Sequence, residues 1–357
     1  MTSPSVISLP FGHFDSRNLL MASAAFVRNI WYMAAWAEEV ADQDFITRTL
    51  LGSPWLIFRQ SDGAWSMIAD RCPHRFVPLS RGRRIGDTIQ CGYHGLTFDG
   101  AGQCVGTPFP TPVPENARVR SLPIVERHRG LWFWPGDADK ADPALIPDFS
   151  FMDTSQDKFG RLTMAANFEL IADNLMDLSH AEMLHVDTFG ANGSLYTHGK
   201  QTVSNGEDGS IQNNWDITDA TPPPFAAPML EEGGRIDQQI HMRWHAPACM
   251  ALKVGIFKAG SETRDPVVPT MISPHILTPE SDGSTHYFYS HEPSQQAEDM
   301  TMRVFLGEDE PMVGAAHVAM GGDDFWDLRP VILPSDAAAI RARRVLKQKR
   351  SAELQDH

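Results

Sequence analysis

Two short Cys-His motifs constrain this chain more than any other feature of its sequence. Cys72-Pro73-His74 has the form CxH, and Cys91-Gly92-Tyr93-His94 has the form CxxH. Each motif lies among glycine, proline and other turn-forming residues, which predicts two loops rather than helices or strand interiors. Two thiols and two imidazoles at such short spacings are a metal-ligand set. The chain must therefore bring these two loops together.

Three interpretations of this ligand set are open. A [2Fe–2S] cluster held by two thiolates on one iron and two imidazoles on the other needs these residues. A tetrahedral zinc site uses the same ligand types, and two buried cysteines near two histidines can also be ordinary packing. The spacing and the β-hairpin signals around the motifs favour the iron–sulfur cluster over a zinc finger.

A second constellation follows about 90 residues later, where Asp177, His180 and His185 lie in a segment with helical periodicity. In a regular helix, positions 177 and 180 lie about 60° apart, whereas 180 and 185 lie about 140° apart. Both histidines can therefore reach one metal only if the helix ends or is distorted between them. The alternative is a pair of satisfied polar residues at a helix end. A cluster has no O₂-binding position, so the first motif favours a separate open Fe(II) site here.

The pattern along the chain predicts an α+β protein with two domains, each with its own core. Short apolar runs between turns predict an all-β domain, and a charged, proline-containing linker follows it. The second part combines a helical segment at 168–185, strand-like runs, and helices near 299–320 and from Ser335, as N-cap, to about Glu353. The predicted units are an N-terminal extension at 1–26, an all-β domain with the Cys-His motifs at 27–136, a linker at 137–148, and a second domain at 149–357 in which helices pack against an antiparallel sheet. The strand-like runs are 210–218, 237–247, 250–257, 269–279 and 285–293.

The motifs also carry a family resemblance. The segments CPHR, CGYHGLTFDGAGQC, VERHRGLWFWPGD and ADPALIPDF resemble the Rieske domain of oxygenases in the vanillate and dicamba O-demethylase branch, and the similarity continues to the C-terminus. It implies that the second domain is catalytic and that its sheet is wrapped around helices in a helix-grip-like arrangement. It implies a [2Fe–2S] cluster held by Cys72, His74, Cys91 and His94. It also implies a mononuclear Fe(II) held by His180, His185 and Asp309, with O₂ as co-substrate. Asp309 is favoured because related oxygenases keep their carboxylate ligand in the helix after the last strand; Glu308 and Glu310 remain alternatives.

The same resemblance implies roles for residues around the iron. Asp177 is expected to join His180 to His94 of the partner subunit, which implies a homotrimer. Asn174, one turn earlier, is expected to line the iron site, although it can equally be a helix-surface amide. The expected substrate pocket consists of residues that can equally belong to the core: His275, Leu252, Met300 and Phe305. Pro311 should bend the helix that carries Asp309.

The resemblance implies a terminal oxygenase that takes electrons from a ferredoxin or an NAD(P)H-dependent reductase and oxidises a small aromatic substrate. O-demethylation of a methoxylated aromatic acid or phenol is favoured, and hydroxylation of a ring or methyl group is the alternative. A Rieske electron-transfer protein would leave the second constellation unexplained, and a ligand-binding module would leave the first unexplained. An arginine group beside the first motif either attracts an acidic redox partner or is a solvated loop: Arg71, Arg75, Arg81, Arg83 and Arg84.

Composition narrows the remaining possibilities. The formal net charge is −15, which disfavours nucleic acid or an anionic membrane as the main partner. The chain has no apolar run of about 18 residues, and its start lacks the basic and apolar regions of a signal peptide. We therefore expect a cytoplasmic protein.

Overall fold

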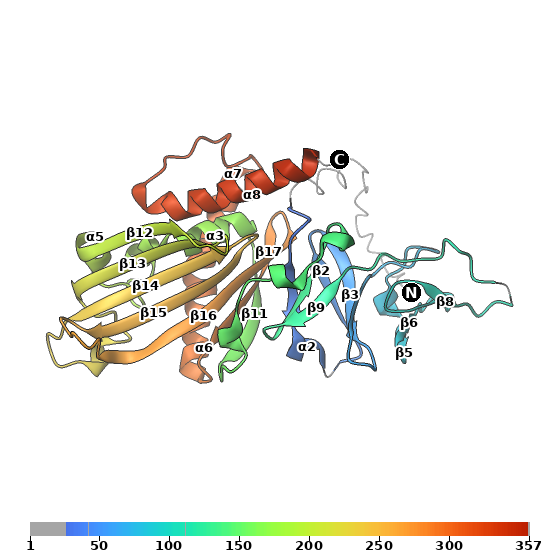
Figure 1. The fold of residues 1–357 in the computed structure, drawn as a ribbon, viewed down its shortest axis with the longest axis horizontal. Coiled ribbons are helices and arrows are strands. Elements are labelled where there is room, and N and C mark those ends of the chain that lie inside the picture. Colours follow the sequence, from blue (N-terminus) through green and yellow to red (C-terminus); the bar gives the residue numbers. More distant parts are fainter. Residues whose placement is uncertain (1–25, 42, 111, 356–357) are drawn as a thin grey trace, which may run out of the picture.

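The computed structural model describes residues 26–41, 43–110 and 112–355, so the predicted extension at 1–26 lies outside the described residues apart from Phe26. An N-terminal all-β part lies beside a large antiparallel sheet whose surface is covered by helices (Figure 1). This confirms the predicted α+β class and its order along the chain.

The N-terminal part is built from short antiparallel strands. Among the described residues they form three small sheets, with strand orders β1-β10-β9, β2-β3-β4 and β5-β6-β7-β8. The strands are β1 (Tyr32–Trp36), β2 (Ile46–Leu50), β3 (Ser53–Arg59), β4 (Trp65–Ala69), β5 (Arg83–Ile85), β6 (Thr88–Gln90), β7 (Thr97–Phe98), β8 (Cys104–Gly106), β9 (Ile124–Arg127) and β10 (Gly130–Phe133), with helix α2 (Ala37–Ala41) and the 3₁₀ turn η1 (Leu79–Arg81) between them. Figure 1 shows β5, β6 and β8 at the end of the molecule farthest from the large sheet.

The large sheet of the second part has seven described strands in the order β11-β17-β16-β15-β14-β13-β12. They are β11 (Lys158–Met164), β12 (Gly199–Asn205), β13 (Ile211–Ala220), β14 (Ile236–His245), β15 (Cys249–Lys258), β16 (Pro266–Ser281) and β17 (Ser284–His291). The five inner strands coincide with the predicted runs. The two edge strands were not predicted, because they are more exposed and lack a clear apolar alternation.

Helices cover one face of this sheet, and α8 runs along it towards the N-terminal part (Figure 1). The helical elements are α3 (Phe168–Met176), η5 (Leu178–His180), α4 (Ala181–Leu184), α5 (Ser194–His198), α6 (Gln295–Met302), the π-helix η7 (Arg303–Asp309), α7 (Glu310–Met320), η8 (Pro334–Asp336) and α8 (Ala337–Gln355); the remaining 3₁₀ turns are η2 (Ala138–Lys140), η3 (Pro143–Leu145), η4 (Ser150–Met152) and η6 (Ala227–Met229).

One detail of the predicted helices was wrong. The cap before α8 is not Ser335: the 3₁₀ turn η8 precedes the helix, and its N-cap is Leu333, whose amide N–H donates to the Asp336 carboxylate. Pro311 is the second residue of α7, which continues η7 without a break, so its missing N–H lies inside a longer helix. The irregularity beside Asp309 is a π-helical stretch that ends just before this proline.

The hydrophobic core does not divide as the sequence predicted. The largest buried cluster contains Tyr32 and Phe133 of the N-terminal part together with Leu162 and Trp244 of the large sheet, so the two parts share one core. The reason is that β1 and β2 pack directly against β16. A separate, smaller cluster surrounds the first Cys-His motifs: Leu56, Phe58, Ile68, Cys72, Leu79, Ile89, Cys91, Phe98 and Val119.

Within residues 26–41, 43–110 and 112–355, no helix has both the length and the apolar character needed to cross a bilayer.

Candidate metal centres

The loops that carry the two Cys-His motifs have the same backbone design. The carbonyl of Cys72 accepts the amide N–H of Phe76 (2.9 Å), and the carbonyl of Cys91 accepts that of Gly95 (3.0 Å). Phe76 and Gly95 both have left-handed φ angles, 62° and 73°. Each cysteine amide also donates to the carbonyl five residues later, at 2.9 and 2.8 Å. Two turns of the same backbone design therefore present the two Cys-His pairs, with the histidine two residues after the cysteine in the first and three residues after it in the second.

The side chains of these loops fit a [2Fe–2S] cluster. Cys72 and Cys91 are buried free thiols, and burial, together with the neighbouring Cys91 thiol, raises the pKa of Cys72. The rings of His74 and His94 lie 4.6 Å apart. Nδ1 of His94 is buried without a hydrogen-bond partner in the described structure, as expected of an atom that binds a metal. This donor set, two thiols and two imidazoles, matches the chemistry of a Rieske cluster.

Close backbone contact explains one glycine of the second loop. A Cβ atom on Gly92 would lie 2.5 Å from the carbonyl oxygen of Arg81, which is backbone and cannot move aside cheaply. The loop therefore requires glycine here in order to lie against the C-terminal end of η1. Of the five arginines around this region, all but Arg84 are exposed. Arg84 instead hydrogen-bonds backbone carbonyls and packs over the Phe58 ring.

The second constellation forms a compact triad in the other part of the molecule. His180 Nε2 lies 3.2 Å from His185 Nε2 and 3.5 Å from Asp309 Oδ1, and His185 Nε2 lies 3.3 Å from the same oxygen. Ligand bonds of about 2.1 Å meeting at right angles would separate neighbouring ligand atoms by about 3 Å. Two histidines and one carboxylate at these separations fit one face of a divalent iron.

The helix breaks where the spacing of the histidines requires it. Helix α3 ends at Met176, and the Asp177 amide donates to the carbonyls of Asp173 and Asn174. The Asp177 carboxylate then caps the next turn by accepting from the amide and hydroxyl of Ser179, at 3.1 and 2.6 Å. Helix α4 is only four residues long and ends immediately before His185. The predicted distortion between the histidines is therefore present.

Asp309 is the last residue of the π-helix η7 and is largely buried. Asn174 Nδ2 donates to its Oδ1 at 3.1 Å, so Asn174 faces the triad. Burial acts against the charged carboxylate, but the neighbouring imidazoles of His180 and His185 outweigh it and lower the pKa of Asp309 to about 2. Burial also acts against a charged His185, yet Asp309 and Glu308 together raise the pKa of its imidazole. The carboxylates and imidazoles of the site thus stabilise one another's charged forms.

The two acidic neighbours of Asp309 have other contacts. Glu308 Oε2 lies 2.7 Å from Nδ1 of His185, on the opposite edge of the ring from Asp309. Glu310 Oε1 accepts the amide of Ala165 at 2.8 Å. Of the three acids that the sequence left open, Asp309 is therefore the one whose carboxylate meets both histidine Nε2 atoms.

Asp177 makes a different contact from the expected one. His180 Nδ1 approaches the backbone carbonyl of Asp177 rather than its carboxylate. The carboxylate is turned away because it caps η5 through Ser179. Its second oxygen, Oδ2, has no hydrogen bond from the described residues.

A wall of aromatic and polar groups stands next to the triad. His275 is buried, its Nε2 lies 3.0 Å from Ser273 Oγ, and its Nδ1 contacts the Tyr287 hydroxyl. Burial lowers the pKa of His275 to about 4, so the ring is neutral at pH 7. The Phe305 ring lies 5.9 Å from His275 and 4.8 Å from Tyr287. Since Phe305 is one π-helical turn before Asp309, this wall adjoins the triad.

The other two predicted pocket residues, Leu252 and Met300, lie in different places: one on the sheet face that carries His275 and one at the surface. Leu252 pairs with Ser273 across β15 and β16, so it lies on the same sheet face as His275. Met300 lies on α6 and lines a surface depression of about 400 Å³ with Gln296, Asp299 and Arg303. Sequence reasoning missed Ser273 and Tyr287, although their alternation with His275 on paired strands gave a signal for them.

Comparison with known proteins places these features in a family. Residues 30–123 match the Rieske [2Fe-2S] domain, and residues 164–352 match the vanillate O-demethylase oxygenase C-terminal domain. The chain is 34% identical to the oxygenase component of chloroacetanilide N-alkylformylase from Rhizorhabdus wittichii, over 92% of this chain and 97% of the relative. It is also 34% identical to the oxygenase component of dicamba O-demethylase from Stenotrophomonas maltophilia, over 90% and 97%. A crystal structure of dicamba monooxygenase with non-haem iron and dicamba superposes with a TM-score of 0.74 at 32% identity, covering 93% of this chain and 99% of that one.

Proposed function

Because this chain belongs to the Rieske non-haem iron oxygenases, as an oxygenase component of the dicamba and vanillate O-demethylase type, we propose that it oxidises the O-methyl group of a methoxylated aromatic acid or phenol. It is an oxidoreductase of the Rieske monooxygenase class. The iron, when bound, supplies O₂ activation, and the [2Fe–2S] cluster supplies single electrons.

The observation that carries this proposal is the triad of His180, His185 and Asp309 next to a buried aromatic wall. A planar substrate ring can pack against Phe305 and Tyr287, and a neutral, buried His275 can hydrogen-bond a polar ring substituent. A methyl group on a ring oxygen would then be held close to the triad. We assign Leu252 to the same wall and Met300 to its outer approach.

We propose that the site is completed by a partner subunit in a homotrimer. Figure 1 shows the strands beside the cluster loops and helix α3 in distant parts of one chain. Large apolar side chains are exposed at both places: Phe76 and Tyr93 beside the cluster, and Met183 and Tyr196 beside the iron triad. A head-to-tail ring would bury both patches against each other.

In this arrangement Asp177 bridges the subunits through two different groups. Its backbone carbonyl holds Nδ1 of His180. The open Oδ2 of its carboxylate would accept Nε2–H of His94 of the partner subunit, because Nδ1 of that ring is the atom expected to bind the cluster. Asn174 holds Asp309 on the same side of the site.

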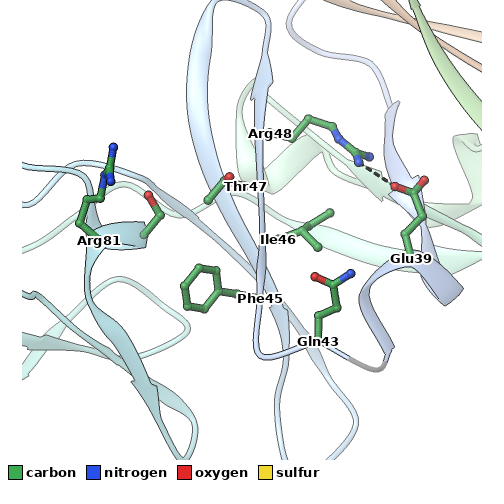
Figure 2. A pocket seen from close by; sticks show the side chains of 8 residues that line it. Glu39, Gln43, Phe45, Ile46, Thr47, Arg48 and Arg81 are labelled. Carbon is green, nitrogen blue, oxygen red and sulfur yellow. Dashed lines mark hydrogen bonds and ion pairs between the residues drawn. The ribbon is translucent and has the colours of Figure 1, made fainter.

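The electron donor is proposed to be a ferredoxin or an NAD(P)H-dependent reductase that docks on the N-terminal part. A depression of about 660 Å³ lies there between η1 and the edge strand β2. Figure 2 shows Arg81 and Phe45 on one side of β2, and Arg48 and Glu39, joined by an ion pair, on the other. Exposed arginines near a cluster favour an acidic partner. We also propose a cytoplasmic location, which is supported by Cys104 and Cys249, the two cysteines outside the cluster motifs, because neither forms a disulfide.

N-dealkylation of an aromatic amide is a second candidate, because the N-alkylformylase component is as similar to this chain as the dicamba O-demethylase component is. Both reactions oxidise a carbon attached to a heteroatom of an aromatic substrate. Hydroxylation of a ring methyl group would use the same site without releasing a one-carbon product.

The first test is the metal content of anaerobically purified protein. We expect about three irons and about two acid-labile sulfides per chain, with a low average g-value in the EPR spectrum of the reduced cluster. Zinc in place of iron, or the absence of sulfide, would contradict the oxygenase assignment.

The second test separates the candidate substrates. With a generic ferredoxin and reductase, we would compare methoxybenzoates, the matching methylbenzoates and N-alkyl anilides. Formaldehyde and a phenol from the methoxybenzoates alone support O-demethylation. Turnover of the anilides alone would replace it with N-dealkylation, and hydroxymethyl products alone would replace it with methyl hydroxylation.

A further inference from the structure

The two histidines of the iron triad are held differently on the side away from the metal. Nδ1 of His180 meets a neutral backbone carbonyl, that of Asp177. Nδ1 of His185 meets the carboxylate of Glu308 at 2.7 Å. Carbonyl and carboxylate oxygens only accept hydrogen bonds, so both rings have a proton on Nδ1, and Nε2, the atom nearest Asp309, is the one left to bind a metal. Only His185, however, donates to an anion.

The carboxylate of Glu308 is itself held in place. Its Oε1 accepts Nε–H of Arg303 at 2.9 Å, and its Oε2 also accepts the Thr188 hydroxyl at 3.3 Å. Arg303 is further tied to Asp187 at 3.4 Å, and Thr188 is fully buried. Both oxygens of Glu308 are therefore engaged, and the side chain is only 14% exposed. A carboxylate bound in this way is a fixed acceptor rather than a spare metal ligand.

The π-helix η7 explains how two consecutive acids reach one ring. Backbone hydrogen bonds in a π-helix join residues five apart, and Arg303 and Glu308 stand at this separation. In the same stretch Glu308 contacts Nδ1 and Asp309 contacts Nε2, so neighbouring carboxylates take opposite edges of His185. Short π-helical stretches within α-helices often mark functional sites.

We propose that Glu308 is a positioning residue that fixes the tautomer and orientation of His185 and increases its basicity as a metal ligand, with Arg303 and Thr188 holding Glu308 in place. This inference rests on the proposed role of His180, His185 and Asp309 as the iron site. A carboxylate behind a metal-bound imidazole strengthens its electron donation, and its loss typically weakens metal binding by about 10- to 100-fold. The two histidines would consequently be unequal ligands, with His185 the stronger.

The test measures metal affinity rather than turnover. Protein that retains its cluster but has lost the mononuclear iron to a chelator is titrated anaerobically with Fe²⁺ alone, in competition with a chromophoric chelator. Glu308→Gln keeps the size of the side chain but removes its charge, and Glu308→Leu removes the acceptor. We expect the affinity to fall about tenfold in Glu308→Gln and about 100-fold in Glu308→Leu.

Glu310→Gln is the matched control, because Glu310 lies on the same helical segment but accepts a backbone amide away from the triad. It should bind Fe²⁺ as the parent does. The cluster spectrum and the melting temperature should be the same in all variants. In addition, the EPR spectrum of the Fe²⁺–nitric oxide adduct should change its rhombicity in Glu308→Gln but not in Glu310→Gln, since a changed His185 donor alters the ligand field.

Three results would overturn the inference. Unchanged affinity and an unchanged nitric oxide spectrum in both Glu308 variants would refute the role of Glu308 while leaving the triad intact. An equal loss in Glu308→Gln and Glu310→Gln would assign the effect to the helix rather than to the contact with His185. If the parent protein itself binds no mononuclear Fe²⁺, the iron site falls together with the role of Glu308.

Discussion

The two candidate metal centres are built on opposite principles. The ligands of the first come from two loops of the same short stretch, and each loop repeats the same hydrogen bonds around its cysteine. The ligands of the second come from a broken helix and a π-helix that are separated by most of the large sheet in sequence. One centre is defined by local sequence, whereas the other exists only after the second part has folded.

This difference determines what each centre does for the fold. Cys72 and Cys91 belong to the small hydrophobic cluster of their own region. Because this core is small, we expect the bound metal to contribute to the folding free energy of the region. The iron triad is held by elements that pack into the large shared core. We therefore expect the first centre to stabilise its surroundings and the second to depend on surroundings that are already stable.

The largest effect is expected from Cys91→Ser. It should abolish the [2Fe–2S] cluster and all turnover, and it should lower the melting temperature, because the cluster that joins the two loops is lost. Visible absorption, EPR and calorimetry would measure these effects. The matched control is Cys104→Ser, since the Cys104 thiol contacts the carbonyl of Gly106 on β8 and packs against the edge of the same hydrophobic cluster without belonging to either Cys-His motif. A cluster that survives in Cys91→Ser, or is lost in Cys104→Ser, would show that the ligands are assigned wrongly.

His180→Ala should also abolish turnover, but it should leave the fold unchanged. The protein is expected to lose about one iron per chain while its cluster spectrum and melting temperature remain as in the parent, because the triad does not support the core. His198→Ala, an exposed histidine on α5, is the control. If His180→Ala loses the cluster as well, the two centres are coupled in folding and the contrast between them is wrong.

The same contrast explains how far the sequence could be interpreted. The cluster ligands stand in contiguous motifs, and the pairing of His180 with His185 was readable because their spacing requires a helix break. Asp309 could be chosen over Glu308 and Glu310 only through the family resemblance, because a π-helix shifts which residues share a face and has no marker in the sequence. For the same reason the contact between Glu308 and His185 was not predictable.

The fold, too, could be predicted only where the sequence carries a local pattern. The inner strands were predicted because both of their faces are partly buried and their apolar residues form clear runs. Edge strand β12 has no buried residue, so it left no such pattern. The shared core was missed because the packing of β1 and β2 against β16 is a long-range contact that composition cannot indicate.

Arg343→Met should reveal how strongly the second centre depends on distant residues. Arg343 on α8 is buried and pairs with Glu169 (3.1 Å) and Asp173 (2.7 Å) of α3, the helix that leads into the iron site. Breaking a buried network of this kind leaves uncompensated charge and costs about 3–5 kcal/mol. Urea unfolding would measure the loss, and retention of the mononuclear iron should fall with it.

Burial raises the pKa of Asp173 to about 6 although Arg343 acts in the opposite direction. Asp173 is therefore expected to bind a proton near neutral pH once Arg343 is removed, which moderates the loss. Arg344→Met, an exposed neighbour on the same helix, should change the stability by no more than about 0.5 kcal/mol. Equal effects of the two variants would mean that α8 does not hold α3 through Arg343.

The smallest effect concerns the junction between the two parts. His286 on β17 is buried there, with Nε2 2.8 Å from the Thr49 carbonyl and Nδ1 3.2 Å from Arg161. Burial, with Arg48 and Arg161, lowers its pKa from 6.5 to about 4, although the Thr49 carbonyl and Glu280 oppose this. Below pH 6.5 the His286 imidazole binds a proton in the unfolded chain, whereas in the folded chain it stays neutral until the pH falls to about 4. The stability must therefore fall as the pH falls through this range, by up to about 3 kcal/mol from this residue.

His286→Gln should flatten this part of the pH dependence, whereas His291→Gln, at the end of the same strand, should leave it unchanged. Because His286 lies where the shared core joins the two parts, acid should release the cluster region and the large sheet in one transition. The cluster absorbance and the far-ultraviolet circular dichroism, followed on the same samples between pH 7 and pH 4, would measure this. Two separate transitions would show that the junction is weaker than the shared core indicates, and the two centres would then be independent in stability as well as in construction.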